Sequence, residues 1–188
     1  MVQPSDPTTI TWHSAQALSA SLTPVQQQWL FDDGSLTRRL QDLSCNRFSV
    51  TPLLEGWQPL RDDECAALQI DPGSEGWVRE VYLRGADRPW VFARSVAARS
   101  ALEGSGVDLA QLGSRSLGEL LFSDSAFSRG ELQACIYPAT WLPAEVYAPM
   151  LWARRSCFCR GELGVLVAEV FLPALWQQIA DRPAAASL

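Results

Sequence analysis

The segment from residue 164 to residue 173 reads Gly-Val-Leu-Val-Ala-Glu-Val-Phe-Leu-Pro, which is the composition of a buried β-strand. Branched and aromatic residues fill it, with a glycine before and a proline after. Side chains two positions apart lie on one face of a strand, so Glu169 projects beside Val167 and Phe171. Because an unpaired buried carboxylate is costly, Glu169 needs a cation, hydrogen bonds or a proton. The alternatives are a structural ion pair, a strand that reaches the surface there, or a functional carboxylate in a pocket.

A second strand-like segment, Met150–Arg160, comes just before this one in the chain. The two segments are separated by the turn Gly161–Gly164, a composition that predicts an antiparallel hairpin. Arg154 and Arg155 are neighbours on the first segment and project to opposite faces. Only one of them can therefore lie on the same side of the sheet as Glu169.

Further strands are predicted in the first two thirds of the chain. Residues Trp77–Leu83 and Trp90–Val96 flank a short turn and predict another antiparallel hairpin. Phe48–Leu54 is a strand in which Pro52 indicates an edge or an irregularity. Phe127–Tyr137 has a weaker strand pattern.

Three helices are predicted to begin after hydroxyl residues. Thr23 precedes a helix that starts at Pro24, and Ser35 precedes the helix Leu36–Leu43. Ser116 precedes a third helix, with Glu119 at the position of a capping box. Antiparallel hairpins with a few helices predict the α+β class, as a single domain with an antiparallel sheet of about six strands and helices on one face.

Length and composition limit the possible classes of protein. The chain has 188 residues, of which 47% are hydrophobic, so we expect one globular domain over 1–188 with loose termini at 1–10 and 181–188. No apolar run approaches the ~20 residues of a membrane helix, so we expect no membrane insertion. The first residues lack the basic start and apolar block of a signal peptide, which predicts a cytoplasmic location.

The formal charge of −6 argues against nucleic acid as a partner, because binding to phosphates needs a basic surface. A small anionic ligand is still compatible with this charge. A few arginines gathered in a pocket can attract it, since distance and local dielectric set the interaction.

Cysteine and histidine usage makes metal and disulfide chemistry unexpected. The number of cysteines is five, without a CxxC pair, so neither a disulfide framework nor a zinc site is predicted. Cys157 and Cys159 share a strand face and are interpreted as small core residues. The single histidine, His13, lies in a polar N-terminal segment and makes a histidine-based nucleophile improbable.

Two arginines lie among large apolar residues on the predicted strands. Arg79 shares a face with Trp77 and Val81, and Arg94 shares a face with Phe92. One interpretation is a side chain whose charge reaches water, or a buried ion pair. The other is a guanidinium that binds the carboxylate of a ligand.

The ordered set of segments resembles the chorismate pyruvate-lyase family from about Trp29 to Pro173. No single segment is a strong motif, but their order and spacing together are fairly specific. They are Trp29-Leu30, Gly34-Ser35-Leu36-Thr37-Arg38-Arg39, Ser49-Val50-Thr51, Trp77-Val78-Arg79-Glu80, Pro89-Trp90 through Arg94, Ser116-Leu117-Gly118 with Leu121-Phe122, Leu151-Trp152-Ala153-Arg154-Arg155-Ser156 and Glu169-Val170-Phe171-Leu172-Pro173.

The resemblance implies an antiparallel sheet with helical flaps over a buried ligand site. It implies that Arg79 holds the ring carboxylate and that Glu169 contacts the ring hydroxyl group. Backbone groups of Leu36 and Leu117 would complete the site. The chain departs from better-known members in its longer tail after Pro173 and in Leu36, where they carry methionine, and neither difference threatens a backbone role.

The reaction implied is the conversion of chorismate to 4-hydroxybenzoate and pyruvate, the first committed step of ubiquinone biosynthesis. Aromatisation of the ring drives it, so no metal or redox cofactor is expected. We expect Arg79 and Glu169 to be the catalytic residues, with Glu169 as base or as orienting group. Arg154 or Arg155, supported by Arg94, is expected near the enolpyruvyl carboxylate. We also expect a monomer.

Two other functions are compatible with parts of the sequence. A similar domain binds effectors in some transcription regulators, and would bind a small anion without converting it. No basic helix-turn-helix segment precedes the domain here, which disfavours this alternative. A purely structural or interaction protein, with the eight tryptophans as core, leaves Arg79 and Glu169 without a reason.

Overall fold

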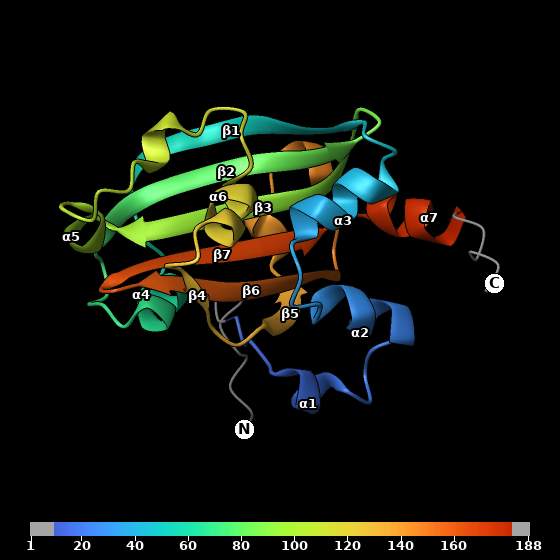
Figure 1. The fold of residues 1–188 in the computed structure, drawn as a ribbon. Coiled ribbons are helices and arrows are strands. Elements are labelled where there is room, and N and C mark those ends of the chain that lie inside the picture. The colour runs from blue at the N-terminus through green and yellow to red at the C-terminus, as the bar shows by residue number, and fades with distance from the viewer. Residues whose placement is uncertain (1–9, 182–188) are drawn as a thin grey trace, which may run out of the picture.

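The computed structural model describes residues 10–181, and these form one seven-stranded antiparallel sheet with helices on both faces (Figure 1). The order across the sheet is β1-β2-β3-β7-β6-β4, and β5 pairs with β6 on the same side as β4. The α+β class is confirmed, with seven strands where about six were expected. The strands are β1 (Phe48–Pro59), β2 (Glu75–Gly85), β3 (Arg88–Ala98), β4 (Ser128–Arg129), β5 (Gln133–Tyr137), β6 (Leu151–Arg160) and β7 (Leu163–Phe171).

Helices connect and cover these strands. The predicted loose termini lie almost wholly outside the described residues. No helix between residues 10 and 181 combines the length and the apolar composition of a membrane span. The α-helices are α1 (Ala15–Leu18), α2 (Pro24–Leu30), α3 (Leu36–Leu43), α4 (Asp62–Leu68), α5 (Arg99–Leu102), α6 (Leu117–Ser123) and α7 (Pro173–Asp181), and short 3-10 turns occupy Leu109–Gln111, Ala139–Trp141 and Ala144–Val146.

The two predicted hairpins, β2–β3 and β6–β7, are confirmed and form the centre of the sheet. The β2–β3 turn consists of Ala86 and Asp87, both with positive φ, as a tight two-residue hairpin turn requires. The hairpins meet where β3 pairs with β7, which places Ala93 opposite Glu169. This pairing brings residues more than 70 positions apart onto one surface.

β1 lies at the edge of the sheet, as Pro52 indicated, but extends five residues beyond the predicted end at Leu54. The register against β2 shifts between Pro52 and Leu54. A bulge there accommodates Pro52, which has no backbone N–H group, and lets pairing continue to Pro59.

The two faces of the sheet carry different helices. α3 and α6 lie over one face, above β2, β3 and β7 (Figure 1). Leu36 and Leu40 of α3 pack there with Val81 and Phe171 of the sheet. α4 lies against the opposite face, where Cys65 joins a separate apolar cluster. Helices therefore cover both faces, and not one face as predicted.

The predicted capping residues of two helices are confirmed, and the capping role predicted for the third, at the start of α6, is wrong. Thr23 forms a full capping box with Gln26, and the hydroxyl group of Ser35 accepts a hydrogen bond from the N–H group of Arg38. Ser116 makes no capping bond to α6. Its hydroxyl group instead bonds to Thr37, a residue of α3 that the sequence pattern did not connect with it.

All five cysteines lie within residues 10–181 and are free there. The interpretation of Cys157 and Cys159 as core residues is wrong in part. Their sulfur atoms lie 3.6 Å apart on one strand face, but Cys157 is only half-buried and Cys159 is exposed. Cys157 packs at the margin of the apolar cluster that includes α4, whereas Cys159 does not belong to a core cluster.

Candidate active site

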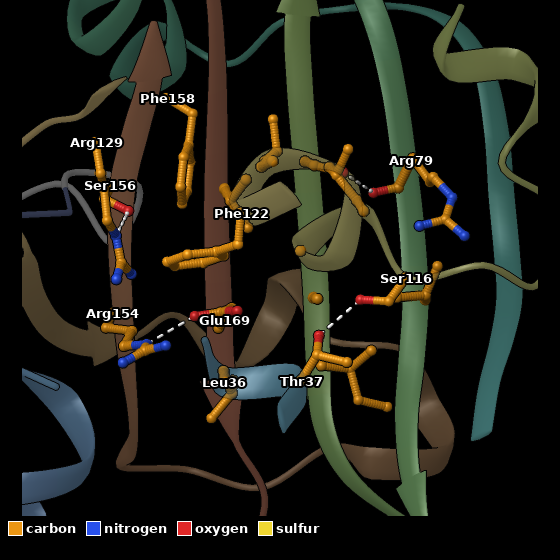
Figure 2. Close-up of a pocket in the computed structure, with 18 residues that line it drawn as sticks. Leu36, Thr37, Arg79, Ser116, Phe122, Arg129, Arg154, Ser156, Phe158 and Glu169 are labelled. Atoms are coloured by element: carbon orange, nitrogen blue, oxygen red, sulfur yellow. Dashed lines mark hydrogen bonds and ion pairs between the residues drawn. The ribbon is translucent and has the colours of Figure 1, made fainter. Parts of the chain in front are cut away.

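A cavity of about 40 Å³ lies between the sheet and the starts of α3 and α6 (Figure 2). β3 contributes only Ala93 and Ser95, and these small residues leave space above the middle of the sheet. Larger side chains surround that space. The lining residues discussed below are Leu36, Thr37, Arg79, Ser116, Leu117, Gly118, Phe122, Arg129, Arg154, Ser156, Phe158 and Glu169.

Glu169 projects from β7 into this cavity and is paired with Arg154. The two residues lie directly opposite each other on β7 and β6, so their side chains leave the same face of the sheet. Arg154 Nε donates to Glu169 Oε2 over 2.7 Å. Of the two neighbouring arginines, Arg154 is thus the one on the Glu169 side. The structural ion pair considered for Glu169 exists, and it lies inside a pocket.

The Arg154 side chain is held from a second direction. It is only 1% exposed, and its Nη1 donates to the carbonyl oxygens of Trp29 and Asp32 over 3.2 and 3.1 Å. These carbonyls belong to the end of α2 and the segment that follows it. The position of Glu169 is therefore set by strand register and by the N-terminal helices.

Arg79 lies in the opposite wall of the cavity, on β2, and is 3% exposed. Its Nε donates to Glu55 Oε1 of β1 over 2.6 Å. Its Nη2 donates to the carbonyl oxygens of Gly113 and Arg115 over 2.6 and 3.0 Å. The partner of Arg79 is thus Glu55, and the buried ion pair considered for this arginine exists. Nη1 has no hydrogen-bond partner among residues 10–181.

Arg79 and Glu169 face the same cavity from two strands that are separated by β3. Arg79 is aligned with Ser95 and Val167, whereas Glu169 is aligned with Ala93. With two strand spacings across and two residues along, their Cα atoms are about 12 Å apart. Glu169 projects into the cavity, whereas the guanidinium of Arg79 is turned toward β1 and the segment before α6, where its hydrogen-bond partners lie (Figure 2).

The starts of α3 and α6 meet above the cavity. The hydroxyl groups of Thr37 and Ser116 lie 2.6 Å apart, and both residues are buried. Because Ser116 bonds to Thr37, the first N–H groups of α6 have no side-chain cap. A Cβ atom at Gly118 would lie 3.0 Å from Thr37 Oγ1, so glycine permits this close approach. Leu36 and Leu117, the two residues expected to act through their backbones, are the first residues of these helices.

Arg94 lies on the opposite face of the sheet, so the structure does not bring it to this cavity. Side chains alternate along β3, and Ala93 and Ser95 occupy the cavity face. Arg94 instead donates to Glu64 of α4 and Glu80 of β2 over 2.6 and 2.8 Å. These bonds outweigh the burial of its guanidinium and raise the pKa of Arg94 above its usual value.

Arg155 also lies on the opposite face, bonded to Gln133 and Asp63, and the structure does not bring it to this cavity either. The sequence already allowed only one of the two neighbouring arginines to face Glu169. The register of β6 against β7 selects Arg154.

The sequence pattern missed Arg129, Thr37 and two aromatic residues of the cavity wall. Arg129 lies on a strand of two residues, which is too short to show alternation. Phe122 of α6 and Phe158 of β6 pack edge to face, with ring centroids 5.4 Å apart. For Thr37, the only sequence feature that could have indicated a role was its own hydroxyl group, directly after Leu36.

Comparisons with known proteins bear on this cavity and on the fold. A family model described as chorismate lyase matches residues 6–181. A protein named probable chorismate pyruvate-lyase from Pseudomonas aeruginosa UCBPP-PA14 is 69% identical over 177 residues, which cover 93% of this chain and 99% of that protein. Another protein of that name, from Pseudomonas putida KT2440, is 64% identical over 168 residues, which cover 89% of this chain and 91% of that protein.

Solved structures of lower identity support the fold alone. The PhnF C-terminal domain aligns with a TM-score of 0.53 at 16% identity, over 66% of this chain and 82% of that domain. The possible transcriptional regulator YydK from Bacillus subtilis aligns with a TM-score of 0.50 at 10% identity, over 75% of this chain and 64% of its own. Since the family model spans nearly the whole chain and the relatives match it end to end, the chain belongs to the chorismate lyase family.

Proposed function

We propose that this protein converts chorismate to 4-hydroxybenzoate and pyruvate. The observation that carries the proposal is the cavity in which Glu169 and Arg79 lie at the two ends of a space floored by Ala93 and Ser95. The names of the relatives, probable chorismate pyruvate-lyase, support the same substrate.

The reaction is an elimination that needs no net oxidation. Chorismate carries a ring carboxylate at C1, an enolpyruvyl ether at C3 and a hydroxyl group at C4. The proton on C4 is lost, its electron pair completes the aromatic ring, and the C3–O bond breaks. The released enolpyruvate takes up a proton and becomes pyruvate. The protein has to hold a dianion, exclude water and place a proton acceptor near C4.

Arg79 and Glu169 are proposed to hold the two ends of the ring. The C1 carboxylate and the C4 hydroxyl group lie para to each other, which suits groups on opposite walls. Arg79 Nη1 is proposed to donate to the carboxylate, together with backbone N–H groups at Leu36 and Leu117, because the start of a helix favours an anion. Glu169 Oε1 is proposed to accept from the hydroxyl group, since Oε2 already binds Arg154.

Arg154 is proposed to act in two ways. It positions Glu169, and it is the remaining candidate of the three arginines that were expected near the enolpyruvyl carboxylate. A second carboxylate beside Glu169 would otherwise meet like charge, so a cation is needed there.

The cavity must open before it can bind this substrate. A volume of about 40 Å³ is close to the ~30 Å³ that one water molecule occupies. A ten-carbon ligand therefore requires α3, α6 or the lining side chains to move. Closure afterwards would keep water away from the reacting ring.

The expected monomeric state, cytoplasmic location and lack of nucleic-acid binding stay predictions. The cavity supports a monomer in one respect, because one chain supplies its lining. The net charge of −6 remains the argument against nucleic acid.

The experiment for the proposal mixes the purified protein with chorismate and follows both products together. Equal amounts of 4-hydroxybenzoate and pyruvate are expected, at a rate proportional to protein concentration. If 4-hydroxybenzoate binds but neither product forms from chorismate, the protein is a ligand-binding domain and the lyase proposal is wrong.

A further inference from the structure

Arg129 of β4 lines the same cavity, and no role has been assigned to it so far. Its Nε donates to Ser156 Oγ over 2.9 Å, and its Nη1 donates to the carbonyl oxygen of Asp33 over 3.1 Å. Its guanidinium lies 5.5 and 5.2 Å from the ring centres of Phe122 and Phe158. Figure 2 shows Arg129 on the same side of the cavity as Arg154.

Arg129 differs from the other arginines in its lack of an anion. Every other buried or half-buried arginine between residues 10 and 181 has a carboxylate oxygen within 4.0 Å, and Arg129 has none. The paired arginines are Arg39, Arg61, Arg79, Arg84, Arg94, Arg99, Arg154, Arg155 and Arg160.

The surroundings of Arg129 make this unpaired charge unfavourable. Burial lowers the pKa of Arg129, and the positive charge of Arg154 acts in the same direction, while the more distant carboxylates of Glu169, Asp33 and Asp32 offset these effects only in part. An aromatic wall and neutral acceptors compensate only partly for lost hydration. A ligand carboxylate at this position would neutralise the positive charge of Arg129.

The order of strands shows which part of the substrate would lie there. On one side of Glu169, β3 presents only Ala93 and Ser95 to the cavity. On the other side, β6 and β4 present Arg154 and Arg129. The C3 ether of chorismate is adjacent to the C4 hydroxyl group. If Glu169 holds that hydroxyl group and Arg79 holds the ring carboxylate, the cations left for the enolpyruvyl carboxylate are those on the β6–β4 side.

We propose that Arg129, together with Arg154, forms the binding site for the enolpyruvyl carboxylate. The inference rests on the proposed function and extends it to a residue that binds substrate but not the aromatic product. Ser156 orients the guanidinium through Nε, and Nη2 has no hydrogen-bond partner among residues 10–181. A substitution of Arg129 tests this binding site more specifically than a substitution of Arg154, because Arg154 also holds Glu169.

Substrate and product differ at the proposed Arg129 site, because 4-hydroxybenzoate lacks the enolpyruvyl group. For Arg129→Gln, kcat/KM for chorismate is expected to fall by about 10- to 100-fold, the range of a charge-assisted hydrogen bond. The Kd for 4-hydroxybenzoate is expected to stay within about twofold, since the product lacks the carboxylate that Arg129 is proposed to bind. Arg129→Lys, which keeps the charge, is expected to recover part of the loss.

Arg88→Gln is the matched control. Arg88 is exposed at the start of β3, so this variant removes the same charge far from the cavity. Kinetics and product binding like those of the unsubstituted protein are expected. A similar loss in both variants would show a long-range effect of net charge and would overturn the proposal.

A second measurement needs no variant. In the unsubstituted protein, 3-(carboxymethoxy)-4-hydroxybenzoate is expected to bind more tightly than its 3-(methoxycarbonylmethoxy) ester, because only the acid has the second carboxylate. Equal affinities, or an Arg129→Gln protein that loses chorismate and 4-hydroxybenzoate alike, would overturn the assignment. Absence of turnover and of 4-hydroxybenzoate binding in the unsubstituted protein would instead overturn the proposed function, and this inference with it.

Discussion

The hydroxyl groups of Thr37 and Ser116 share a buried hydrogen bond of 2.6 Å, although 79 residues separate them in the chain. The bond joins the first turn of α3 to the residue before α6, directly above the cavity. Because the proposed substrate is larger than the cavity, the two helix starts are expected to separate during binding. The bond would then stabilise the closed state.

Substitution of either hydroxyl residue is expected to speed the release of product. Thr37→Val keeps the shape of the side chain but leaves the Ser116 hydroxyl group buried without a partner, at a cost of about 1–3 kcal/mol. The dissociation rate of 4-hydroxybenzoate, measured by stopped-flow fluorescence, should therefore rise. Ser116→Ala should act similarly, and the double variant should be little worse than either single one. Additive effects, or a lower Tm with unchanged dissociation, would contradict a latch.

Arg79 is expected to dominate the binding of the ring carboxylate. Arg79→Ala should weaken binding of 4-hydroxybenzoate by about 2–5 kcal/mol, the range for a buried charge pair that loses one partner. Titration calorimetry measures this directly, with Arg88→Ala as an exposed control. Because Glu55 also loses its partner, a drop in Tm is expected as well. Unchanged affinity in Arg79→Ala would end the assignment.

Glu169 is expected to matter more for turnover than for product binding. In Glu169→Gln the hydroxyl group of the ligand keeps an acceptor, while the group that takes up the C4 proton is lost. kcat should fall by about 10²- to 10⁴-fold, the usual contribution of general acid–base catalysis. Steady-state kinetics alongside the Kd for 4-hydroxybenzoate separates the two effects. Full turnover in this variant would show that Glu169 only orients the ring.

Stability at low pH is expected to depend on Glu64, on the opposite face of the sheet. Burial disfavours its charge, but hydrogen bonds and charges from Arg94 and Arg61 outweigh burial and hold the pKa of Glu64 below its usual 4.5. A carboxyl group whose folded pKa is lowered stabilises the fold above its unfolded pKa, and this stabilisation is lost as pH falls through the folded value. The free energy of unfolding should therefore decline below about pH 4.5.

Glu64→Gln tests this account. At pH 7 the variant should be less stable by about 3–5 kcal/mol, because it breaks a buried ion pair. Its stability should then fall less steeply from pH 5 to pH 3 than that of the unsubstituted protein. Glu162→Gln, at an exposed turn, serves as the control for the loss of one charge. Parallel pH profiles for Glu64→Gln and the unsubstituted protein would be inconsistent with the role of Glu64.

The sequence predicted the elements whose signals are local. The hairpins follow from alternation and turn residues, and the cap at Ser35 follows from residue type. Alternation also placed Glu169 with Val167 on one face. It could not show which faces of different strands coincide, since that depends on register, and this is why the sequence grouped Arg94 with residues that lie on the other face of the sheet.

Contacts between distant segments were beyond the sequence pattern for the same reason. The residue type of Ser116 predicted a helix cap, but a hydroxyl group from α3 competes for its hydrogen bond. Arg129 gave no signal, because a two-residue strand has no period and its neighbours in space come from β6 and α6.

A crystal structure of the protein with 4-hydroxybenzoate tests the central claim most directly. The account predicts one ligand between α3, α6 and the sheet, with its hydroxyl oxygen within hydrogen-bond distance of Glu169 Oε1. Its carboxylate should contact Arg79 and the first N–H groups of the two helices. A ligand in the reverse orientation, with its carboxylate at Arg154 and Arg129, or a ligand outside this cavity would contradict the account.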